Sequence, residues 1–352
     1  MEQIETKVVI ITEDNIDIEA VAQAGKIIKN GGLVAFPTET VYGLGGDAFN
    51  PTSSKKIYAA KGRPSDNPLI VHIADMDDLE KVASDVNDMA YLIAEAYWPG
   101  PLTMIFNKKG AVPKETTGGL DTVAVRFPSH PIAQAFIKAA GGFVAAPSAN
   151  ISGRPSPTEA KYVVEDMSGR IEMIIDGGSC QIGLESTIID MTGNKPVILR
   201  PGYITPADLE KLVKEVDIDR TILDDQSGLA PKAPGMKYRH YAPKAGLTIV
   251  NGEAKDVVNY INDAAFKAHN DGLRCGVIAT KESISLYNAD SIKDVGSRDD
   301  DEAIARNLFR VLREFDDEDI DLIYTEGFGN EGLSMATMNR LLKAAGHKEV
   351  KV

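Results

Sequence analysis

The side chains most suited to chemistry lie between Lys61 and His72, where the sequence reads Lys-Gly-Arg-Pro-Ser-Asp-Asn-Pro-Leu-Ile-Val-His. Gly62 is typical of a helix end, and the two prolines exclude a helix interior, so Arg63 to Pro68 is predicted to be a turn. Leu69 to Ile73 is predicted to be a strand. Cations, amide and hydroxyl groups and a histidine would then lie where an α/β sheet opens its binding crevice, which suits a ligand that carries phosphate. An isolated Lys-Gly-Arg sequence would more often be an ordinary charged turn.

Polar side chains recur at other predicted strand ends of the first half. In the strand Thr122 to Phe127, alternation places Thr122, Ala124 and Arg126 on one face and Val123 and Val125 on the other. The small Ala124, between a hydroxyl and a guanidinium, leaves room for a ligand. Cations and hydroxyls outnumber carboxylates in the whole set, which favours binding an anion and stabilising charge on phosphoryl or carboxyl oxygens. The set comprises Thr38, Thr40, Lys61, Arg63, Asn67, His72, Thr122, Arg126, Ser148, Ser156, Ser186, Thr187 and Arg200.

Two local patterns have both a structural and a functional interpretation. Gly43-x-Gly45-x-x-Ala48 matches a relaxed dinucleotide fingerprint, but its glycines do not follow a predicted strand directly. We expect either a tight irregular loop or backbone that lies close to a ligand. Ser156 to Glu159 has the form of a capping box that opens a helix through Met167, and a helix start is also an anion site.

Composition restricts the class of protein. The 352 residues are enough for two domains, and 43% hydrophobic residues with 26% charged residues are typical of a globular chain. The net charge of −14 argues against a broad nucleic-acid or membrane surface. We find no signal-peptide pattern and no apolar run long enough to cross a bilayer, so a cytoplasmic protein is predicted. The separated Cys180 and Cys275 indicate neither a disulfide framework nor a zinc site.

The chain changes character after Val216. The stretch from Asp224 to Gly235 is rich in Pro, Gly and Ala, which is typical of a linker, and a basic, aromatic segment follows it. From Leu247 onward, predicted strands and helices alternate, which indicates a small parallel α/β unit. The predicted organisation is a catalytic domain over residues 1–217, a linker over 218–245 that reaches over the active site, and a C-terminal domain over 246–352.

Five ordered motifs and the segment after them resemble a known family. The first half closely resembles the YrdC-like domain, and the segment Pro234 to Pro243 with the α/β tail looks like the long, two-domain Sua type of threonylcarbamoyl-AMP synthase. The resemblance implies an N-terminal YrdC-like twisted mixed sheet with a large cavity and a smaller C-terminal Rossmann-like α/β domain. The five motifs are Phe36 to Leu44, Lys61 to His72, Pro147 to Asn150 with Ser156, Glu185 to Ile188, and Leu199 to Gly202.

The family resemblance implies an activity and its reactants. Such an enzyme joins L-threonine, bicarbonate or CO2, and ATP into threonylcarbamoyl-AMP and pyrophosphate. The product would supply a separate tRNA threonylcarbamoyl transferase. Mg2+ would enter with ATP rather than on protein side chains, and neither stable nucleic-acid binding nor a membrane is expected. The alternatives are a double-stranded RNA-binding module and a related carbamoyl or acyl adenylate-forming enzyme.

The same resemblance assigns the site residues by position. Lys61 and Arg63 would act on the reacting phosphates. The group that resembles the ATP site contains Lys61, Arg63, Asn67, Thr122, Ser148, Ser156, Arg200 and Tyr241. The group that resembles the threonine site contains Thr40, His72, Arg126, Ala146 and either Ser186 or Thr187. Arg126 suits the amino-acid carboxylate because a guanidinium can bind both oxygens.

Overall fold

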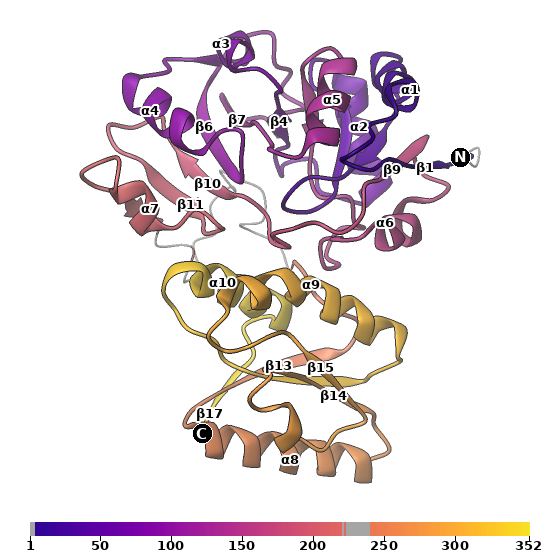
Figure 1. The fold of residues 1–352 in the computed structure, drawn as a ribbon, viewed down its shortest axis with the longest axis vertical. Coiled ribbons are helices and arrows are strands. Elements are labelled where there is room, and N and C mark those ends of the chain that lie inside the picture. The colour runs from indigo at the N-terminus through magenta and orange to yellow at the C-terminus, as the bar shows by residue number, and fades with distance from the viewer. Residues whose placement is uncertain (1–3, 220–221, 223–239) are drawn as a thin grey trace. The chain divides into compact units, whose positions relative to one another are not determined.

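The computed structural model describes residues 4–219, 222 and 240–352, which form two compact units (Figure 1). The first comprises 1–152, 156–181 and 185–237, and the second comprises 153–155, 182–184 and 238–352, as far as these residues are described. Residues 220–221 and 223–239 of the predicted linker lie outside the described residues. None of the described helices is both long enough and apolar enough to cross a membrane.

The first unit is built on one mixed sheet, which confirms the predicted mixed sheet of the N-terminal half. Its described strands run in the order β1-β9-β2-β3-β8-β4-β7-β6-β10-β11-β12, with β5 paired to β6. The strands are β1 (Lys7–Ile10), β2 (Val34–Phe36), β3 (Gly43–Asp47), β4 (Ile70–His72), β5 (Ala83–Ser84), β6 (Leu102–Lys108), β7 (Thr122–Arg126), β8 (Val144–Ala146), β9 (Met173–Asp176), β10 (Thr187–Asp190), β11 (Val197–Arg200) and β12 (Asp217–Ile218).

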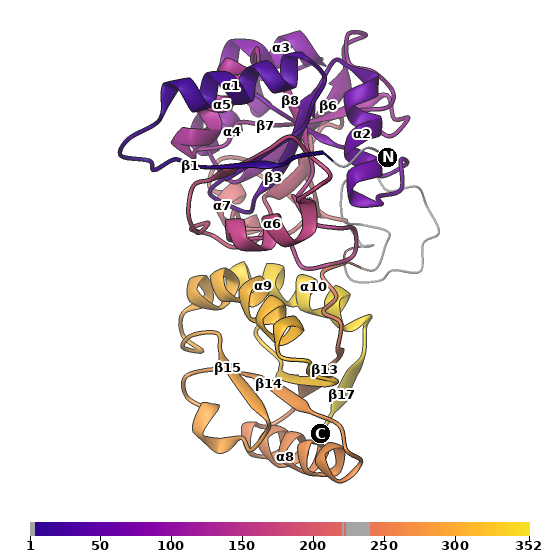
Figure 2. The same cartoon turned by 90° about the vertical axis from the view of Figure 1, so that its right-hand side faces the viewer.

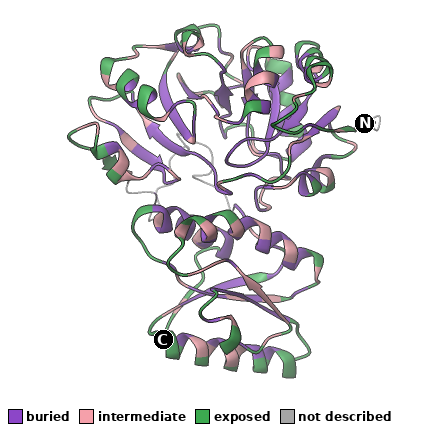
Figure 3. Cartoon of the chain, in the orientation of Figure 1, coloured by how far each residue is buried: buried purple, intermediate pink, exposed green. Residues whose placement is uncertain are grey.

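Helices cover this sheet and bury its apolar side chains. Figure 3 shows the strands largely buried, with the exposed residues concentrated on helices and loops. The helices are α1 (Ile18–Lys29), α2 (Pro51–Lys61), α3 (Leu79–Val82), α4 (Asp88–Tyr97), α5 (Pro131–Ala139), α6 (Ala160–Met167) and α7 (Pro206–Glu210), with a short 3-10 turn, η1 (Met76–Asp78). A side-chain N-cap from Asn50 opens α2, and Gly62 ends it in the left-handed conformation that its sequence predicts.

Strand β3 corrects the expectation of an irregular loop. Gly43, Gly45 and Gly46 lie inside this strand, and β3 pairs antiparallel with β2 and β8. A Cβ atom on Gly45 would lie 2.7 Å from Cγ1 of Val144, and one on Gly43 would lie 3.0 Å from the ring of Phe36. Glycine is therefore required here because neighbouring side chains occupy the space that a side chain would need.

The second unit confirms the predicted parallel α/β arrangement. Its sheet has the order β15-β14-β16-β13-β17, and every recorded pair is parallel. Figure 2 shows α8 on one face of this sheet and α9 and α10 on the other. The strands β15 and β17 were not predicted. The elements are β13 (Gly246–Asn251), α8 (Ala254–Asn270), β14 (Cys275–Ala279), η3 (Ile284–Leu286), β15 (Ser291–Asp294), α9 (Asp301–Asp317), β16 (Leu322–Glu326), α10 (Gly332–Ala345) and β17 (Glu349–Lys351).

Candidate functional site

The two faces of the central strands in the first unit differ in what packs on them. On one face, Val71, Val125 and Met104 join a large core cluster that includes Ile93 of α4. On the other face, a small separate cluster contains no residue from a helix among its described members. The alternation predicted for β7 is thereby confirmed. The small cluster consists of Ile70, Ile105, Ala124, Ile188 and Leu199, with Val197 packed against it.

Arg126 lies at the end of β7 on the face of that small cluster. It is opposite His72 in the parallel pair β4–β7 and opposite Thr103 in the antiparallel pair β6–β7. The Arg126 side chain is buried, and its Nη2 lies 2.8 Å from Oε1 of the equally buried Glu39. Two of the predicted strand ends, at His72 and Arg126, and the Pro37–Tyr42 segment therefore meet at one guanidinium. Glu39 was not among the predicted site residues.

His72 is held as a neutral side chain beside Arg126. Burial, and then the Arg126 guanidinium, lower the pKa of His72 to about 3. Its Nδ1 lies 3.0 Å from the carbonyl oxygen of Ile70. A ring that stays uncharged at neutral pH can position a polar group of a ligand without adding charge. A role of His72 in binding threonine, which the family resemblance implies, stays a prediction.

Ser186 connects Arg126 with the next strand pair. The hydroxyl of Ser186 lies 2.8 Å from that of Thr103, which is opposite Arg126. Arg200 donates from Nε and Nη2 to the carbonyl oxygen of Ser186, at 3.0 and 2.9 Å. Thr187 instead donates to the carbonyl oxygen of Ile204 at 2.7 Å. Both hydroxyls therefore have partners within the protein, and the choice between Ser186 and Thr187 stays open.

Lys61 fixes the loop that follows β8. Its ammonium group is almost fully buried and donates to the carbonyl oxygens of Ser148 and Asn150, the latter at 2.5 Å. The Ser148 hydroxyl donates to Oδ1 of Asn150 at 2.5 Å. The structure thus brings Lys61 and Ser148 together and adds Asn150 to the site. Asn150 belongs to the family motif Pro147 to Asn150, so the sequence contained a signal for it. Binding of phosphate by Lys61 stays a prediction.

The turn between α2 and β4 is held by its own backbone. Arg63 donates from Nε to the carbonyl oxygen of Asn67 and from Nη2 to that of Pro68, at 3.3 and 3.2 Å. Tyr58 donates to the carbonyl oxygen of Glu115 at 3.0 Å.

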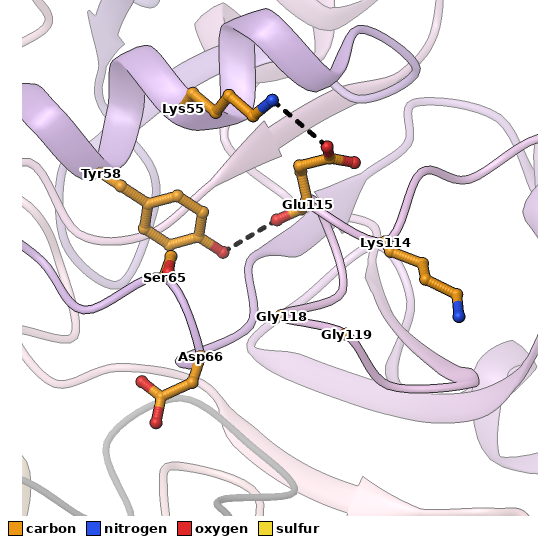
Figure 4. A pocket seen from close by; sticks show the side chains of 8 residues that line it. All are labelled: Lys55, Tyr58, Ser65, Asp66, Lys114, Glu115, Gly118 and Gly119. Atoms are coloured by element: carbon orange, nitrogen blue, oxygen red, sulfur yellow. Dashed lines mark hydrogen bonds and ion pairs between the residues drawn. The ribbon is translucent and has the colours of Figure 1, made fainter.

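A pocket of about 450 Å³ lies beside this turn (Figure 4). Arg63 and Asn67 are not among its lining residues, so it is distinct from the predicted ATP site; the lining is Lys55, Tyr58, Ser65, Asp66, Lys114, Glu115, Gly118 and Gly119.

Ser156 has a different local role from the predicted one. Helix α6 begins at Ala160, and its N-cap residue Glu159 makes no side-chain capping bond. Ser156 instead donates to Oε1 of the buried Glu185 at 2.6 Å. The capping-box prediction is therefore wrong, because a tertiary contact 29 residues away replaces the local one.

The remaining predicted residues are described but not linked to a ligand. Thr40 is buried, with its hydroxyl 2.9 Å from that of Thr38. Ala146 is opposite Ile70 in the pair β4–β8, and Thr122 is opposite Asn107 in the pair β6–β7. Tyr241 is 5% exposed, and its ring stacks on Phe309 at 5.0 Å within the second unit. Its contact with ATP stays a prediction.

The described residues contain no group of three or more His, Cys, Asp or Glu side chains that could hold a metal ion. The charged groups buried around the loops and strands described above are Lys61, Arg63, Arg126 and Arg200, with Glu39, Asp166 and Glu185 as acids. Four cations against three carboxylates, together with several hydroxyls, form a site that can hold anionic oxygens and leave little charge for general acid–base work.

Comparisons with known proteins point to one family. A family model described as "Telomere recombination" matches residues 26–202, and one described as "Threonylcarbamoyl-AMP synthase, C-terminal domain" matches residues 204–346. The chain is 46% identical to the threonylcarbamoyl-AMP synthase of Pyrococcus abyssi over 98% of this chain and 99% of that protein. It is 45% identical to the threonylcarbamoyl-AMP synthase of Bacillus subtilis over 94% of each chain. The crystal structure of P. abyssi Sua5 complexed with L-threonine superimposes with a TM-score of 0.93 at 46% identity, covering 99% of this chain and 100% of that one.

Proposed function

Because this chain belongs to the threonylcarbamoyl-AMP synthase family, we propose that its first unit condenses L-threonine, bicarbonate or CO2, and ATP into threonylcarbamoyl-AMP and pyrophosphate. The polar face centred on Arg126 binds threonine, and the loops held by Lys61 and Arg63 bind the phosphates of ATP. Mg2+ enters with the triphosphate, where it neutralises phosphate charge.

One observation supports the threonine assignment most directly. Nε and Nη2 of Arg126 are buried and have no hydrogen-bond partner in the described part of the chain. Buried donors are nearly always bonded, so a guanidinium with two donors outside any hydrogen bond, of which Nη2 contacts Glu39 only as an ion pair, is suited to accept an anionic ligand. A carboxylate supplies two oxygens at the spacing of these two nitrogens. The neutral His72, which is opposite Arg126 in the pair β4–β7, suits the threonine hydroxyl.

The reaction needs positioning and exclusion of water more than acid–base catalysis. The neutral amine of threonine attacks the carbon of CO2, one C=O π bond opens to give the carbamate, and the amine proton passes to water. A carbamate oxygen then attacks the α-phosphorus of ATP, and the bond to the pyrophosphate oxygen breaks. Cations beside the phosphates stabilise the charge that the leaving pyrophosphate gains. Both carbamate and mixed anhydride hydrolyse readily, which favours a site closed to water.

Partners and location are part of the same proposal. The product is an activated threonylcarbamoyl group, which a separate tRNA threonylcarbamoyl transferase would consume. We expect no stable complex with nucleic acid, since the net charge is −14. A cytoplasmic location follows from that role and stays a prediction.

Release of pyrophosphate tests the proposed reaction. The purified chain is incubated with ATP and Mg2+, with threonine, serine or no amino acid, each with and without bicarbonate. We expect release that requires threonine and bicarbonate together. Release without any amino acid would contradict the proposal, and release with other amino acids at equal rate would indicate a related adenylate-forming enzyme. Salt-sensitive retention of double-stranded RNA without turnover would indicate the binding module instead.

A further inference from the structure

Glu39 and Arg126 form a buried ion pair in the first unit. The exposed fraction is 4% for each residue, and Oε1 of Glu39 lies 2.8 Å from Nη2 of Arg126. Glu39 lies in the segment after β2, and Arg126 ends β7, so the pair joins two elements distant in sequence. A buried pair of this kind is costly to assemble and calls for an explanation beyond stability.

The hydroxyl of Thr38 fixes the turn that carries Glu39. The hydroxyl of Thr38 accepts from the backbone N–H of Thr40 and of Val41, at 3.2 Å each, and donates to the carbonyl oxygen of Val41 at 2.6 Å. These bonds close a tight turn around Glu39. The carboxylate is therefore presented by a fixed loop, as expected for a group that recognises a ligand.

Four polar atoms of the pair make no hydrogen bond within the described part of the chain. Both carboxylate oxygens of Glu39, and Nε and Nη2 of Arg126, are buried without a hydrogen-bond partner in the part of the chain that the structure describes. The 2.8 Å approach of the two groups does not have the orientation of a hydrogen bond. Nη2 and Oε1 contact each other as an ion pair, whereas Nε and Oε2 have no recorded contact. A donor and an acceptor side by side suit a ligand that offers both kinds of group.

An α-amino acid offers this combination. Its carboxylate and ammonium groups are attached to one carbon atom, so the protein groups that bind them must be neighbours, as Arg126 and Glu39 are. We propose that Glu39 binds the α-amino group of the substrate while Arg126 binds its carboxylate. This inference rests on the proposed function and adds a specificity residue to it. The neutral pair matches a zwitterion of zero net charge and excludes ligands that carry a carboxylate alone.

A simpler role for Glu39 would be to position Arg126 only. The two roles differ in what happens to a ligand without an amino group. If Glu39 contacts the amino group, its loss weakens L-threonine selectively. If Glu39 only positions Arg126, its loss weakens every ligand that carries the carboxylate by the same factor.

A cycle of two proteins and two ligands separates these roles. The unchanged chain and Glu39→Gln are titrated by calorimetry with L-threonine and with the 2,3-dihydroxybutanoate of matching stereochemistry, in which a hydroxyl replaces the amino group. We expect Glu39→Gln to weaken L-threonine about 10- to 100-fold, the usual effect of one hydrogen bond between charged groups, and the analogue less than about 3-fold. Equal losses for both ligands, or no loss for L-threonine, would overturn the proposal.

Two further variants keep the test decisive. Glu39→Asp retains the charge but shortens the side chain, so it should fold and still lose threonine affinity even if Glu39→Gln does not fold. Glu326→Gln is the matched control, because Glu326 is also buried and paired with an arginine, Arg298, but lies in the second unit. It should leave threonine affinity unchanged. If the unchanged chain binds threonine but releases no pyrophosphate, the proposed reaction fails while the assignment of Glu39 stands.

Discussion

Arg126→Ala is the substitution with the best-defined consequence. It removes both open donors, Nε and Nη2, and with them the two charge-assisted hydrogen bonds proposed for the threonine carboxylate. Bonds of this kind contribute about 1.5–3 kcal/mol each, and the two are not fully additive, so a loss of roughly 3–4 kcal/mol is expected. This loss corresponds to a rise of roughly 150- to 900-fold in the threonine concentration required.

The same substitution leaves Glu39 buried without its cation. Removal of one partner of a buried ion pair destabilises a protein by about 3–5 kcal/mol. Chemical denaturation should show this loss for Arg126→Ala and a smaller loss for the double variant Glu39→Gln/Arg126→Ala, which removes both charges. The double variant therefore separates effects on the fold from effects on binding.

Pyrophosphate release provides the kinetic measurement. Initial rates are recorded over a range of threonine at saturating ATP, and over a range of ATP at saturating threonine. We expect the KM for threonine to rise by the factor given above and the KM for ATP to change less than about 3-fold, since no proposed ATP contact involves Arg126. Equal rises in both KM values would refute the assignment of Arg126 to the threonine carboxylate.

Three more substitutions test other parts of the structure. Lys61→Met removes the ammonium group that holds the Ser148 loop and should lower turnover by roughly 100-fold or more; unchanged turnover would contradict a role at the phosphates. The folded-state pKa of His72 is about 3 against an ordinary value of 6.5, so the unfolded chain takes up more protons and stability is lost as the pH falls through that window. Between pH 7 and pH 4.5 the free energy of unfolding that His72 contributes falls by about 2–3 kcal/mol. Denaturation curves should show that His72→Gln removes this part of the pH dependence and that the control His269→Gln leaves it unchanged. A Cβ on Gly202 would lie 2.4 Å from the backbone nitrogen of Thr187, so Gly202→Ala should destabilise the first unit by roughly 2 kcal/mol or more, and a neutral result would show that the loop can shift.

Strands and helices with a strong hydrophobic pattern along their own sequence were predicted. The alternation of β7 identified its core face, because Val123 and Val125 are strictly interleaved with Ala124 and Arg126. The parallel unit was predicted from regular alternation of strands and helices, apart from β15 and β17. The strand β17 has only three residues, and β15 is half-buried throughout, so neither carries a strong apolar signal.

Tertiary contacts explain what the sequence alone could not predict. The glycines of β3 lack the side chains that identify a strand, and only the packing of Phe36 and Val144 explains them. Ser156 bonds to Glu185 rather than to its own helix, and Glu39 pairs with Arg126 across 87 positions of sequence, which no local pattern encodes. Most site residues were predicted from the family motifs and stay predictions, whereas their bonding partners required the structure.

The order of the strands in the first sheet has a consequence for biosynthesis. Strand β1 pairs with β9, and β6 pairs with β10, so the earliest strands wait for partners made much later. Ribosomes elongate at roughly 5–20 residues per second, and the interval between His72 and Arg200 therefore lasts on the order of ten seconds. During this time β4 first waits for β8 and β6 then waits for β10, and the nascent chain cannot yet gain stability from threonine. We expect this half of the protein to depend on chaperones during translation more than the compact α/β half that follows it.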